Sequence, residues 1–348
     1  MDKKLLSVIV PSYNMEAYLR KNCDSLLIGG EEQEWLDVIL VNDGSTDKTS
    51  AIAHEYVTRF PTVFRVIDKV NGHYGSCVNA GLAIAKGVYT KVLDADDYVD
   101  TEAFRLYVKT LAAENVVGVV DLIISDYTKV DNDGRVLDVV RYPLPRGHIT
   151  MLDVGWMSFY PHAIAYRTAL LHDMHYQQTE GCAYTDGDWC NHPLAFVKTA
   201  FYYNESVTNY LLGRDGQSVD PKVMLRDISV LLGLVLGNMA FYKAVKNQLE
   251  SKYLEIFRQR IAWRIVGAYS MVLLGINGRI PSFDLRPFDD AVRAFGEGVE
   301  AFTDGQWIPY SLFGRRRKLR YIRLWRKHQT RKTFTFWLYD HFGRPLKA

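Results

Sequence analysis

The sequence has few cysteines and no long apolar run without charge. Its four cysteines, among 348 residues, lie far apart and lack metal-ligand spacing, so we expect packed thiols in a reducing cytoplasm rather than a disulfide framework. The best apolar stretch, IAWRIVGAYSMVLLGI from Ile261, is short and carries Arg264, which is typical of a buried helix. The N-terminal apolar run ends at Pro11 without a small-residue cleavage site, so no export signal is expected.

Two glycine-rich nucleotide signatures are also missing. The sequence has no G-x-x-x-x-G-K-[ST], and no G-x-G-x-x-G follows a strand, which disfavours a dehydrogenase. A nucleotidyltransferase, the alternative enzyme class, is disfavoured because SVIVPSYNMEAYL lacks its N-terminal glycine-rich loop. The glycines of NGHYGSCVNAGLAIAKG instead predict a flexible loop before a helix, where exposed amides and the upstream Lys69 would suit an anion.

Acidic side chains are scarce near the C-terminus. Residues 315–348 hold 12 of the 42 Lys and Arg but only one acid, whereas residues 1–314 hold 30 basic and 39 acidic residues. In 314–342 the cations alternate with aromatics, which predicts a basic interfacial helix on anionic lipid, with Tyr321, Ile322 and Trp325 on one side. A solvated helix packed by its aromatics is an equally weighted alternative. Nucleic-acid binding is the rival from another class, but the acidic body argues against it, so we expect no nucleic-acid partner.

The first hundred residues alternate apolar runs with amphipathic ones. Strands without internal alternation, each followed by a helix, indicate a doubly wound, mostly parallel α/β sheet with helices on both faces. The expected strands are 7–11, 37–43, 64–68 and 89–97, and the expected helices are 15–28, 47–59 and 76–86. Ligands collect at the carboxyl ends of such strands, where the polar clusters of this half lie.

The pattern becomes less regular after Asp100. We expect a helix near 101–114, a hairpin of DLIISDYTKV and RVLDVVR around DNDG, a strand in HAIAYR, a helix over 186–199 and a strand over 200–213. From Pro221 onward the pattern is mainly helical. We therefore predict one domain over 1–220, with a nucleotide-sugar half over about 1–100 and an acceptor half over about 101–220, followed by a helical region over 221–348 with a basic aromatic tail at 314–348.

Polar side chains at the strand ends suggest a nucleotide and a metal. Asp43 ends one strand and would accept hydrogen bonds from a base or ribose, while Tyr13 in PSYN would stack on a flat ring. In KVLDADD, three carboxylates, Asp94, Asp96 and Asp97, would repel one another if buried unpaired, and a Mg²⁺ or Mn²⁺ ion removes that cost. Alternation along an extended chain would put Asp94 and Asp96 on one side. Helix capping before TEAF is the alternative.

SVIVPSYN, VNDGSTDKT, NGHYGSCVNAGLAIAKGVY and KVLDADD, in this order over about 95 residues, resemble the donor half of the family-2 inverting glycosyltransferases with the GT-A fold. The resemblance continues less tightly to about residue 220. It implies that Asp94 contacts the ribose or sugar of a UDP-sugar and that Asp96 binds the Mn²⁺ or Mg²⁺ ion bridging the diphosphate. It also implies donor contacts from the residues that fill the other motif positions: Pro11, Tyr13, Asp43, Lys69, Asn79 and Ala95.

The resemblance and the mechanism together suggest the remaining roles. YTDGDWCNHPL resembles the family's catalytic segment, with Asp186 at the position of the base and Asp188 as the second choice; helix capping by Thr185 and these acids is the alternative reading. Trp189 is a candidate for stacking on the acceptor sugar. LLGRDGQS resembles the family's flexible segment over the donor, which makes Arg214, and less strongly Ser218, candidate phosphate contacts. His162 is a candidate for the metal or the acceptor.

These patterns predict a metal-dependent, inverting glycosyltransferase that moves a sugar from a UDP-sugar to a hydroxyl of a glycan or lipid-linked acceptor. Surface polysaccharide or glycolipid synthesis is the expected setting, in the cytoplasm or at the inner face of the membrane. An inactive sugar-binding or nucleic-acid-binding relative is a further alternative, which retained binding without donor hydrolysis would reveal.

Overall fold

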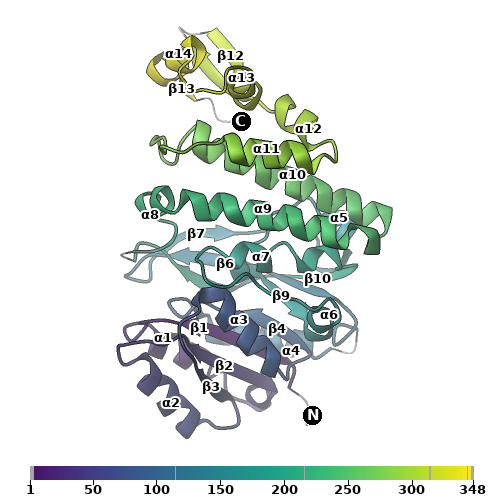
Figure 1. The fold of residues 1–348 in the computed structure, drawn as a ribbon. Helices are drawn as coiled ribbons and strands as arrows, with labels where there is room; N and C mark the ends of the chain where they lie inside the picture. Colours follow the sequence, from purple (N-terminus) through teal and green to yellow (C-terminus); the bar gives the residue numbers. More distant parts are fainter. Residues whose placement is uncertain (1–3, 114, 215, 313–314, 343, 346–348) are drawn as a thin grey trace. The chain divides into compact units, whose positions relative to one another are not determined.

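The computed structural model describes residues 4–113, 115–214, 216–312, 315–342 and 344–345. The chain divides into two compact units (Figure 1). Met1–Ser218 together with Leu249–Ile256 form the first unit, and Val219–Gln248 together with Phe257–Ala348 form the second.

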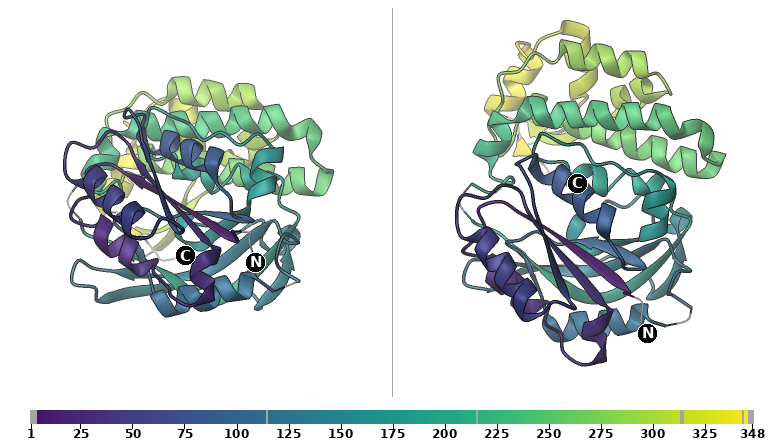
Figure 2. Two further views of the ribbon diagram at one scale, coloured as in Figure 1. Left: turned by 90° about the horizontal axis from the view of Figure 1, so that it is seen from below. Right: turned by 60° about the horizontal axis from the view of Figure 1, so that its bottom comes forward.

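A mixed, mostly parallel ten-stranded sheet organises the first unit (Figures 1 and 2). Its order is β3-β2-β1-β4-β9-β6-β10-β5, with β7 paired to β6 and β8 paired to β10. The strands are β1 Leu6–Ser12, β2 Leu36–Asn42, β3 Phe64–Asp68, β4 Tyr89–Val92, β5 Tyr98–Val99, β6 Leu122–Val130, β7 Val136–Val140, β8 Gly147–Thr150, β9 Ile164–Arg167 and β10 Thr199–Leu211. Because β1 to β4 run parallel, their carboxyl ends meet at one edge of the sheet.

Helices cover both faces of this sheet because β1 is apolar on both sides. Val8 and Val10 pack in one core cluster with α1, α2 and α4, while Ile9 packs in the other with α3 and α6 (Figure 2). The helices are α1 Leu19–Ser25, η1 Glu31–Trp35, α2 Thr49–Arg59, α3 His73–Ile84, α4 Thr101–Leu111, α5 Met151–Val154, η2 Pro161–Ala163, α6 Thr168–Asp173, α7 Asp186–Trp189 and η3 Pro193–Ala195. The predicted α/β class, with helices on both faces, is confirmed.

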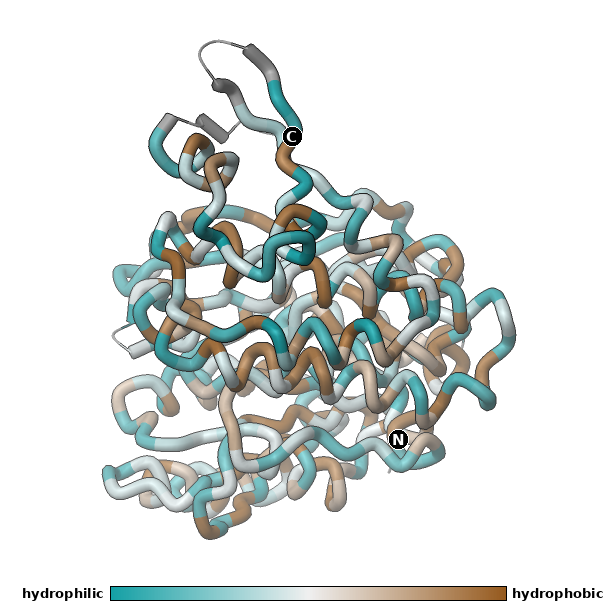
Figure 3. Tube along the Cα trace, turned by 45° about the horizontal axis from the view of Figure 1, so that its top comes forward, coloured by the Kyte–Doolittle hydropathy of each residue, from teal (hydrophilic) through white to brown (hydrophobic). Residues whose placement is uncertain are grey.

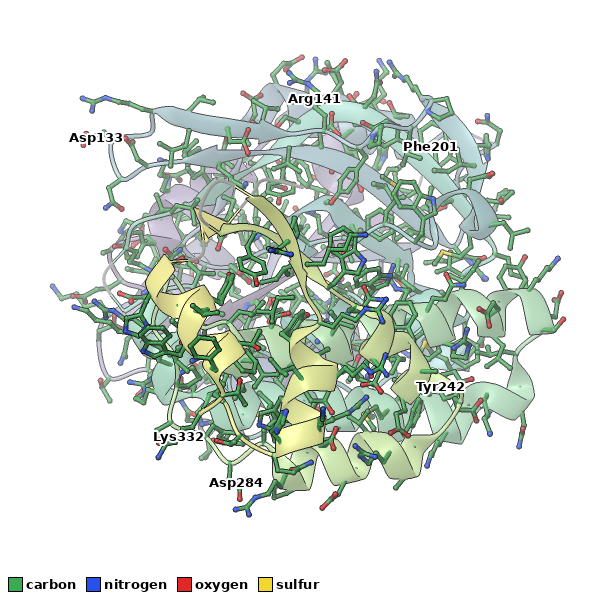
Figure 4. All side chains as sticks on the ribbon, turned by 90° about the horizontal axis from the view of Figure 1, so that it is seen from above. Asp133, Arg141, Phe201, Tyr242, Asp284 and Lys332 are labelled. Atoms are coloured by element: carbon green, nitrogen blue, oxygen red, sulfur yellow. The ribbon has the colours of Figure 1, made fainter. Side chains whose placement is uncertain are left out.

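Two predicted elements differ from the structure. The strand expected to reach residue 97 ends at Val92, because the acidic residues after it form a turn. The helix expected over 186–199 is only α7 and the short turn η3, because Pro193 has no N–H to continue a helix. The expected hairpin is present as β6 and β7, and Asp133 lies in the turn that joins them (Figure 4).

The second unit is mainly helical, with a small sheet of order β12-β11-β13. Its elements are α8 Pro221–Arg226, α9 Ile228–Val245, η4 Lys246–Gln248, α10 Ser251–Leu273 (residues up to Ile256 belong to the first unit), α11 Arg286–Phe295, α12 Val299–Gly305, β11 Ile308–Leu312, β12 Arg315–Leu319, α13 Tyr321–His328, α14 Phe334–Phe342 and β13 Arg344–Pro345. Hydrophobic and hydrophilic segments alternate along the long helices (Figure 3). Among the described residues, one helix, Ile228–Gln248, is long and apolar enough to cross a membrane, with a mean hydropathy of 1.7. Of that window, 44% is buried, and a single such helix is weak evidence for a span because the core helices of soluble proteins meet the same criteria of length and composition.

The C-terminal tail is not the single interfacial helix that the sequence predicts. Within 314–342 the chain forms strand β12 and the two helices α13 and α14; Gly314 lies outside the described residues. The aromatic side of α13 was predicted correctly, but Tyr321, Ile322 and Trp325 are buried in the protein rather than available to lipid.

Candidate active site

The acidic turn after β4 is the centre of the candidate site. The amide of Asp97 donates to the carbonyl oxygen of Asp94 at 3.0 Å, which closes the turn. From α1, the side-chain amide of Asn22 donates to the backbone oxygens of Asp94 at 3.0 Å and Asp97 at 2.9 Å. The expectation that Asp94 and Asp96 share one side of an extended chain is therefore wrong, because this segment is a turn.

Asp94, Asp97 and His162 form a compact ligand set. One ligand atom from each lies within 4.8 Å of the others. Asp94 Oδ1 accepts a hydrogen bond from the Tyr74 hydroxyl at 2.8 Å, and Asp97 Oδ1 accepts one from the Leu211 amide at 2.9 Å. His162 Nδ1 is 3.0 Å from Asp97 Oδ2, which is within ion-pair distance, but this oxygen makes no aligned hydrogen bond.

Burial sets the charge state of this cluster. Burial, and after it the charge of Asp97, raises the pKa of Asp94 to about 7, while burial and Asp96 raise the pKa of Asp97 well above its usual value. Burial also lowers the pKa of His162 to about 4 and that of Lys91, which donates to the His162 carbonyl at 2.6 Å, to about 7. Two buried carboxylates beside a neutral imidazole are the kind of environment that a divalent cation stabilises, so these residues fit Mn²⁺ or Mg²⁺.

Asp96 lies outside this ligand set. Its Oδ2 accepts a hydrogen bond from Nε of Arg214 at 2.8 Å, and the two side chains are only 10% and 23% exposed. The guanidinium of Arg214 also lies over the Tyr18 ring, 5.8 Å from its centroid. The prediction that Asp96 is the metal ligand is not realised in this arrangement, because the turn directs Asp97 toward His162 and Asp96 toward Arg214.

The predicted uridine contacts come together at the ends of β1 and β2. The Asp43 amide donates to the Ser12 carbonyl at 2.9 Å, and its buried carboxylate accepts from Lys69 Nζ at 2.8 Å and from the Gly72 amide at 2.9 Å. Tyr13 is 47% exposed beside them, which leaves its ring available to a ligand. The structure therefore joins Asp43 and Lys69 in one polar cluster at the predicted edge.

Three other donor predictions have different surroundings. Pro11 is buried within β1 opposite Val41, and Ala95 is buried in the acidic turn. Ser218 is exposed at the end of the first unit.

Asn79 has a positioning role in the structure. From α3, its amide nitrogen donates to the Gln178 carbonyl at 2.9 Å and to Glu180 Oε1 at 2.8 Å, while its oxygen accepts from the Gln178 amide at 2.9 Å. Both ends of the Asn79 amide thus hold residues 178–180, the segment that leads to α7. In this arrangement the donor contact predicted for Asn79 is not available.

Asp186 and Asp188 have contrasting environments on α7. Asp188 is 2% exposed, and its Oδ2 accepts from the Thr179 amide at 3.1 Å. Asp186 is less buried, and its charge acts on the ring residues around the ligand set. For Tyr74, burial raises the pKa most, followed by the charges of Asp94 and Asp186. Of this pair, Asp186 is the less buried acid, and it lies near enough to Tyr74 and His162 for its charge to act on both.

Neither a capping side chain nor an acceptor-facing tryptophan is found on α7. The Thr185 side chain makes no capping bond; its Oγ1 accepts from Gln178 Nε2 at 3.1 Å. Trp189 is 1% exposed and packs edge-on against Tyr166 and Tyr176, with ring centroids 5.1 and 5.7 Å away. The prediction that Trp189 stacks on an acceptor is wrong, because its ring lies in the core.

Sequence reasoning missed the aromatic surroundings of the cluster. Tyr210 stacks on His162 with centroids 4.0 Å apart, and Tyr74 binds Asp94. Tyr127 lies 5.3 Å from the His162 ring and 6.0 Å from Tyr160, which is 52% exposed. These contacts join residues far apart in the chain, so no local sequence pattern predicts them. Tyr74 was readable only as part of the glycine-rich segment.

Comparisons with known proteins agree with this geometry. The fold is that of GT-A glycosyltransferases: the crystal structure of S. aureus TarS matches with a TM-score of 0.61 and 20% identity, covering 85% of this chain and 50% of TarS. Residues 7–174 match the model of Glycosyl transferase family 2. This segment therefore belongs to glycosyl transferase family 2.

Curated relatives match a limited part of their length. The MG025 homolog of Mycoplasma pneumoniae, named as a glycosyltransferase, is 43% identical over 105 residues, 30% of this chain and 35% of the relative. The glycosyltransferase EpsJ of Bacillus subtilis is 35% identical over 131 residues, 38% and 36% of the two chains. The chondroitin synthase of Pasteurella multocida is 34% identical over 116 residues, 33% of this chain and 12% of the synthase. The matches thus span about a third or less of each relative.

Proposed function

We propose that this protein is an inverting, divalent-cation-dependent glycosyltransferase that moves a sugar from a UDP-sugar to a hydroxyl of a glycan or lipid-linked acceptor. The observation that carries the proposal is the compact set of Asp94, Asp97 and His162 after strand β4, near enough to Asp186 for its charge to act on His162, in a segment that matches family 2. Synthesis of a surface polysaccharide or glycolipid is the proposed setting. The matched chondroitin synthase supports it, as does the minor teichoic acid biosynthesis protein GgaB of Bacillus subtilis, which is 40% identical over 99 residues, 28% of this chain and 11% of that protein.

The donor side rests on the Asp43 cluster. Asp43, with Lys69 and the Gly72 amide, offers a polar edge for a base or ribose, and Tyr13 offers an exposed ring beside it. A UDP donor is supported by the TarS structure in complex with UDP-GlcNAc, which matches this chain with a TM-score of 0.54. A GDP-sugar is the alternative donor to test against a UDP-sugar. A mannosyltransferase of Pyrobaculum calidifontis in complex with GDP-Man and Mn²⁺ also matches this chain, with a TM-score of 0.50.

The acceptor side rests on Asp186. In the proposed reaction the acceptor oxygen forms a bond to the anomeric carbon from the face opposite the leaving group. The bond from that carbon to the diphosphate oxygen breaks, UDP carries away the electron pair, and the Asp186 carboxylate takes the hydroxyl proton. Asp188 is less suited to this role because it is buried and holds the Thr179 amide.

The cation, when bound, supplies positive charge against the diphosphate. Asp94, Asp97 and His162 would hold it. Asp96 is the further ligand proposed from the family resemblance, and its Oδ2 becomes available to the cation when Arg214 leaves it. Once released, Arg214 is a cation of the length and reach to contact a phosphate group.

Calorimetry on the full chain tests the donor. UDP-glucose, UDP-galactose, their N-acetylated forms and GDP-mannose are titrated with Mn²⁺ and again with chelator. Metal-dependent binding of one UDP-sugar is expected, and binding of GDP-mannose alone would contradict the UDP assignment. The anomeric configuration of the product, read by NMR, tests inversion, and a retained configuration would contradict it.

A further inference from the structure

The tail presents cations, not apolar side chains, to solvent. On α13, successive residues are turned by about 100° around the helix axis, so Arg323 and Lys327 share one side, and Arg320 immediately precedes the helix. The opposite side carries Ile322 and Trp325, which are 0% and 5% exposed. Because the apolar side of α13 is buried in the protein, this side cannot insert into a bilayer. The same packing turns the cationic side toward solvent.

The outward cations lack acidic partners. We call them the basic surface, and its members are Arg317, Lys318, Arg320, Arg323, Lys327 and Lys332. All six are exposed, and none makes an ion pair with any residue in the described part of the chain. Two nearby arginines show the contrast: Arg326 is bound to Asp289 and Arg331 to Asp340. Lys332 lies at the edge of the second unit (Figure 4). The positive charge of this surface is therefore uncompensated.

Exposed aromatic rings accompany the basic surface. Phe334 is 72% exposed, and Trp337 and Trp307 are 46% and 42% exposed. Trp337 is flanked by Phe334 and His341, with ring centroids 5.8 and 4.8 Å away, and Lys318 Nζ lies 4.0 Å from the centroid of Trp307. These tryptophan faces are already occupied by neighbours of the same protein, while parts of the rings still reach solvent.

We propose that the basic surface, with Phe334, Trp337 and Trp307, docks the protein on an anionic lipid surface. Lysine and arginine are attracted to anionic headgroups, and Trp and Phe side chains settle at headgroup depth. Nucleic acid fits less well, because base stacking needs free ring faces and the faces of Trp337 and Trp307 have neighbours in the protein. This docking does not depend on the proposed sugar transfer.

Co-sedimentation of the full chain with vesicles tests the proposal. The vesicles contain phosphatidylcholine alone or phosphatidylcholine with a minority of phosphatidylglycerol. We expect binding to the anionic vesicles only, weakened by salt but not abolished, because the aromatic rings supply a salt-resistant part. Arg323→Gln with Lys327→Gln should weaken binding to anionic vesicles roughly 30-fold at low salt. Phe334→Ser should instead reduce mainly the binding that persists at high salt.

A matched double variant controls for net charge. Lys109→Gln with Lys222→Gln removes the same charge from exposed positions on α4 and α8, and it should bind vesicles as the parent does. Thermal unfolding confirms that each variant folds, and unchanged UDP-sugar binding separates docking from the proposed reaction. Equal binding to neutral vesicles, or equal losses in both double variants, would overturn the proposal. Tighter binding of single-stranded nucleic acid than of anionic vesicles would assign the surface to that partner instead.

Discussion

Two acids separated by one residue divide their roles by orientation. Asp188 is buried and accepts the Thr179 amide, whereas Asp186 is less buried and its charge acts on Tyr74 beside the ligand set. We expect Asp186→Asn to lower transfer by about 10² to 10⁴ while leaving UDP binding nearly unchanged, because only the proton acceptor is lost. Initial rates and UDP calorimetry measure the two effects.

Asp188→Asn is the comparison for that change. It should lower the thermal midpoint, because an amide at this buried position presents its NH₂ group to the Thr179 amide or loses part of the charge-assisted hydrogen bond. If Asp188→Asn removes activity without affecting stability while Asp186→Asn retains activity, the assignment of the base is wrong.

Arg214 and a bound cation would compete for the carboxylate of Asp96. Removing the guanidinium should free the Asp96 carboxylate and raise its attraction for a cation. We therefore expect Arg214→Gln to tighten binding of Mn²⁺ alone by roughly threefold to tenfold, while weakening UDP-sugar binding in the presence of Mn²⁺. Calorimetry without any donor gives the first value.

Arg167 offers a matched control for Arg214. It pairs with Asp121 at 2.8 Å, and the two side chains are 28% and 10% exposed, close to the values for Arg214 and Asp96. Arg167→Gln should leave Mn²⁺ affinity unchanged. A gain in Mn²⁺ affinity in both variants would show a general effect of lost positive charge and would contradict a specific role for Arg214.

At the level of elements, helix α3 packs closely against residues 178–181, the segment that leads to α7, at Gly75. A Cβ atom built on Gly75 would lie 1.9 Å from the Thr179 carbonyl oxygen, a backbone atom. We expect Gly75→Ala to displace residues 178–181, lower the free energy of unfolding by about 1 to 3 kcal/mol and reduce transfer. Thermal unfolding and initial rates measure these losses.

Gly233 on α9 is the matched helical glycine. No atom outside its own neighbourhood lies within 4 Å of a Cβ built there, so Gly233→Ala should be neutral or stabilising by up to about 1 kcal/mol. If Gly75→Ala is as stable and as active as Gly233→Ala, the close packing of α3 on residues 178–181 does not constrain the site.

The elements predicted best from the sequence are those specified by local pattern. The strand patterns without internal alternation indicated a parallel sheet, and β1, β2 and β4 are indeed buried along their whole length, while β3 is partly exposed. The prediction of a helix over 186–199 was wrong although a local signal argued against it. Pro193 cannot continue a helix, and a proline also disfavours the helical backbone conformation of the preceding residue, His192. The prediction of a single helix in the tail was wrong for a different reason. The arginine-rich β12 is a strand because it pairs with β11, and no pattern within β12 indicates that contact.

The candidate site was predictable as a location but not as a set of contacts. The acids at strand ends and the family resemblance pointed to the edge of the sheet where Asp43 and Asp94 lie, and the role of Asp186 there stays a prediction. The pairing of Asp97 with His162 and of Asp96 with Arg214 depends on a turn and on residues 65 or more positions away. Such pairings follow from the tertiary fold, so a sequence motif alone cannot decide which acid faces the metal.

On the scale of the whole molecule, the second unit depends on a buried ion pair. Asp289 and Arg326 are 1% and 8% exposed, and Arg326 Nε lies 2.7 Å from the Asp289 carboxylate, which also binds Arg293 at 2.8 Å and the Tyr269 hydroxyl. Burial alone would raise the pKa of Asp289, but the hydrogen bonds from Tyr269, Arg293 and Arg326 outweigh burial and hold that pKa below its usual value. The pair therefore links the stability of this unit to pH.

Because the folded pKa of Asp289 lies below the unfolded value of about 4, its contribution is fully present above that value and is lost as the pH falls through the folded pKa. Asp289→Asn, which leaves Arg326 buried without its carboxylate, should cost about 3 to 5 kcal/mol near pH 7 and flatten the acid side of the stability curve. Asp284→Asn, at the exposed pair with Arg286, should leave the stability nearly unchanged at any pH, because solvent screens that pair. Chemical denaturation from pH 3 to 8 measures both. If the two variants lose the same stability and both keep the parent's decline of stability at low pH, the second unit does not rely on the Asp289 pair. Its stability would then come from apolar packing.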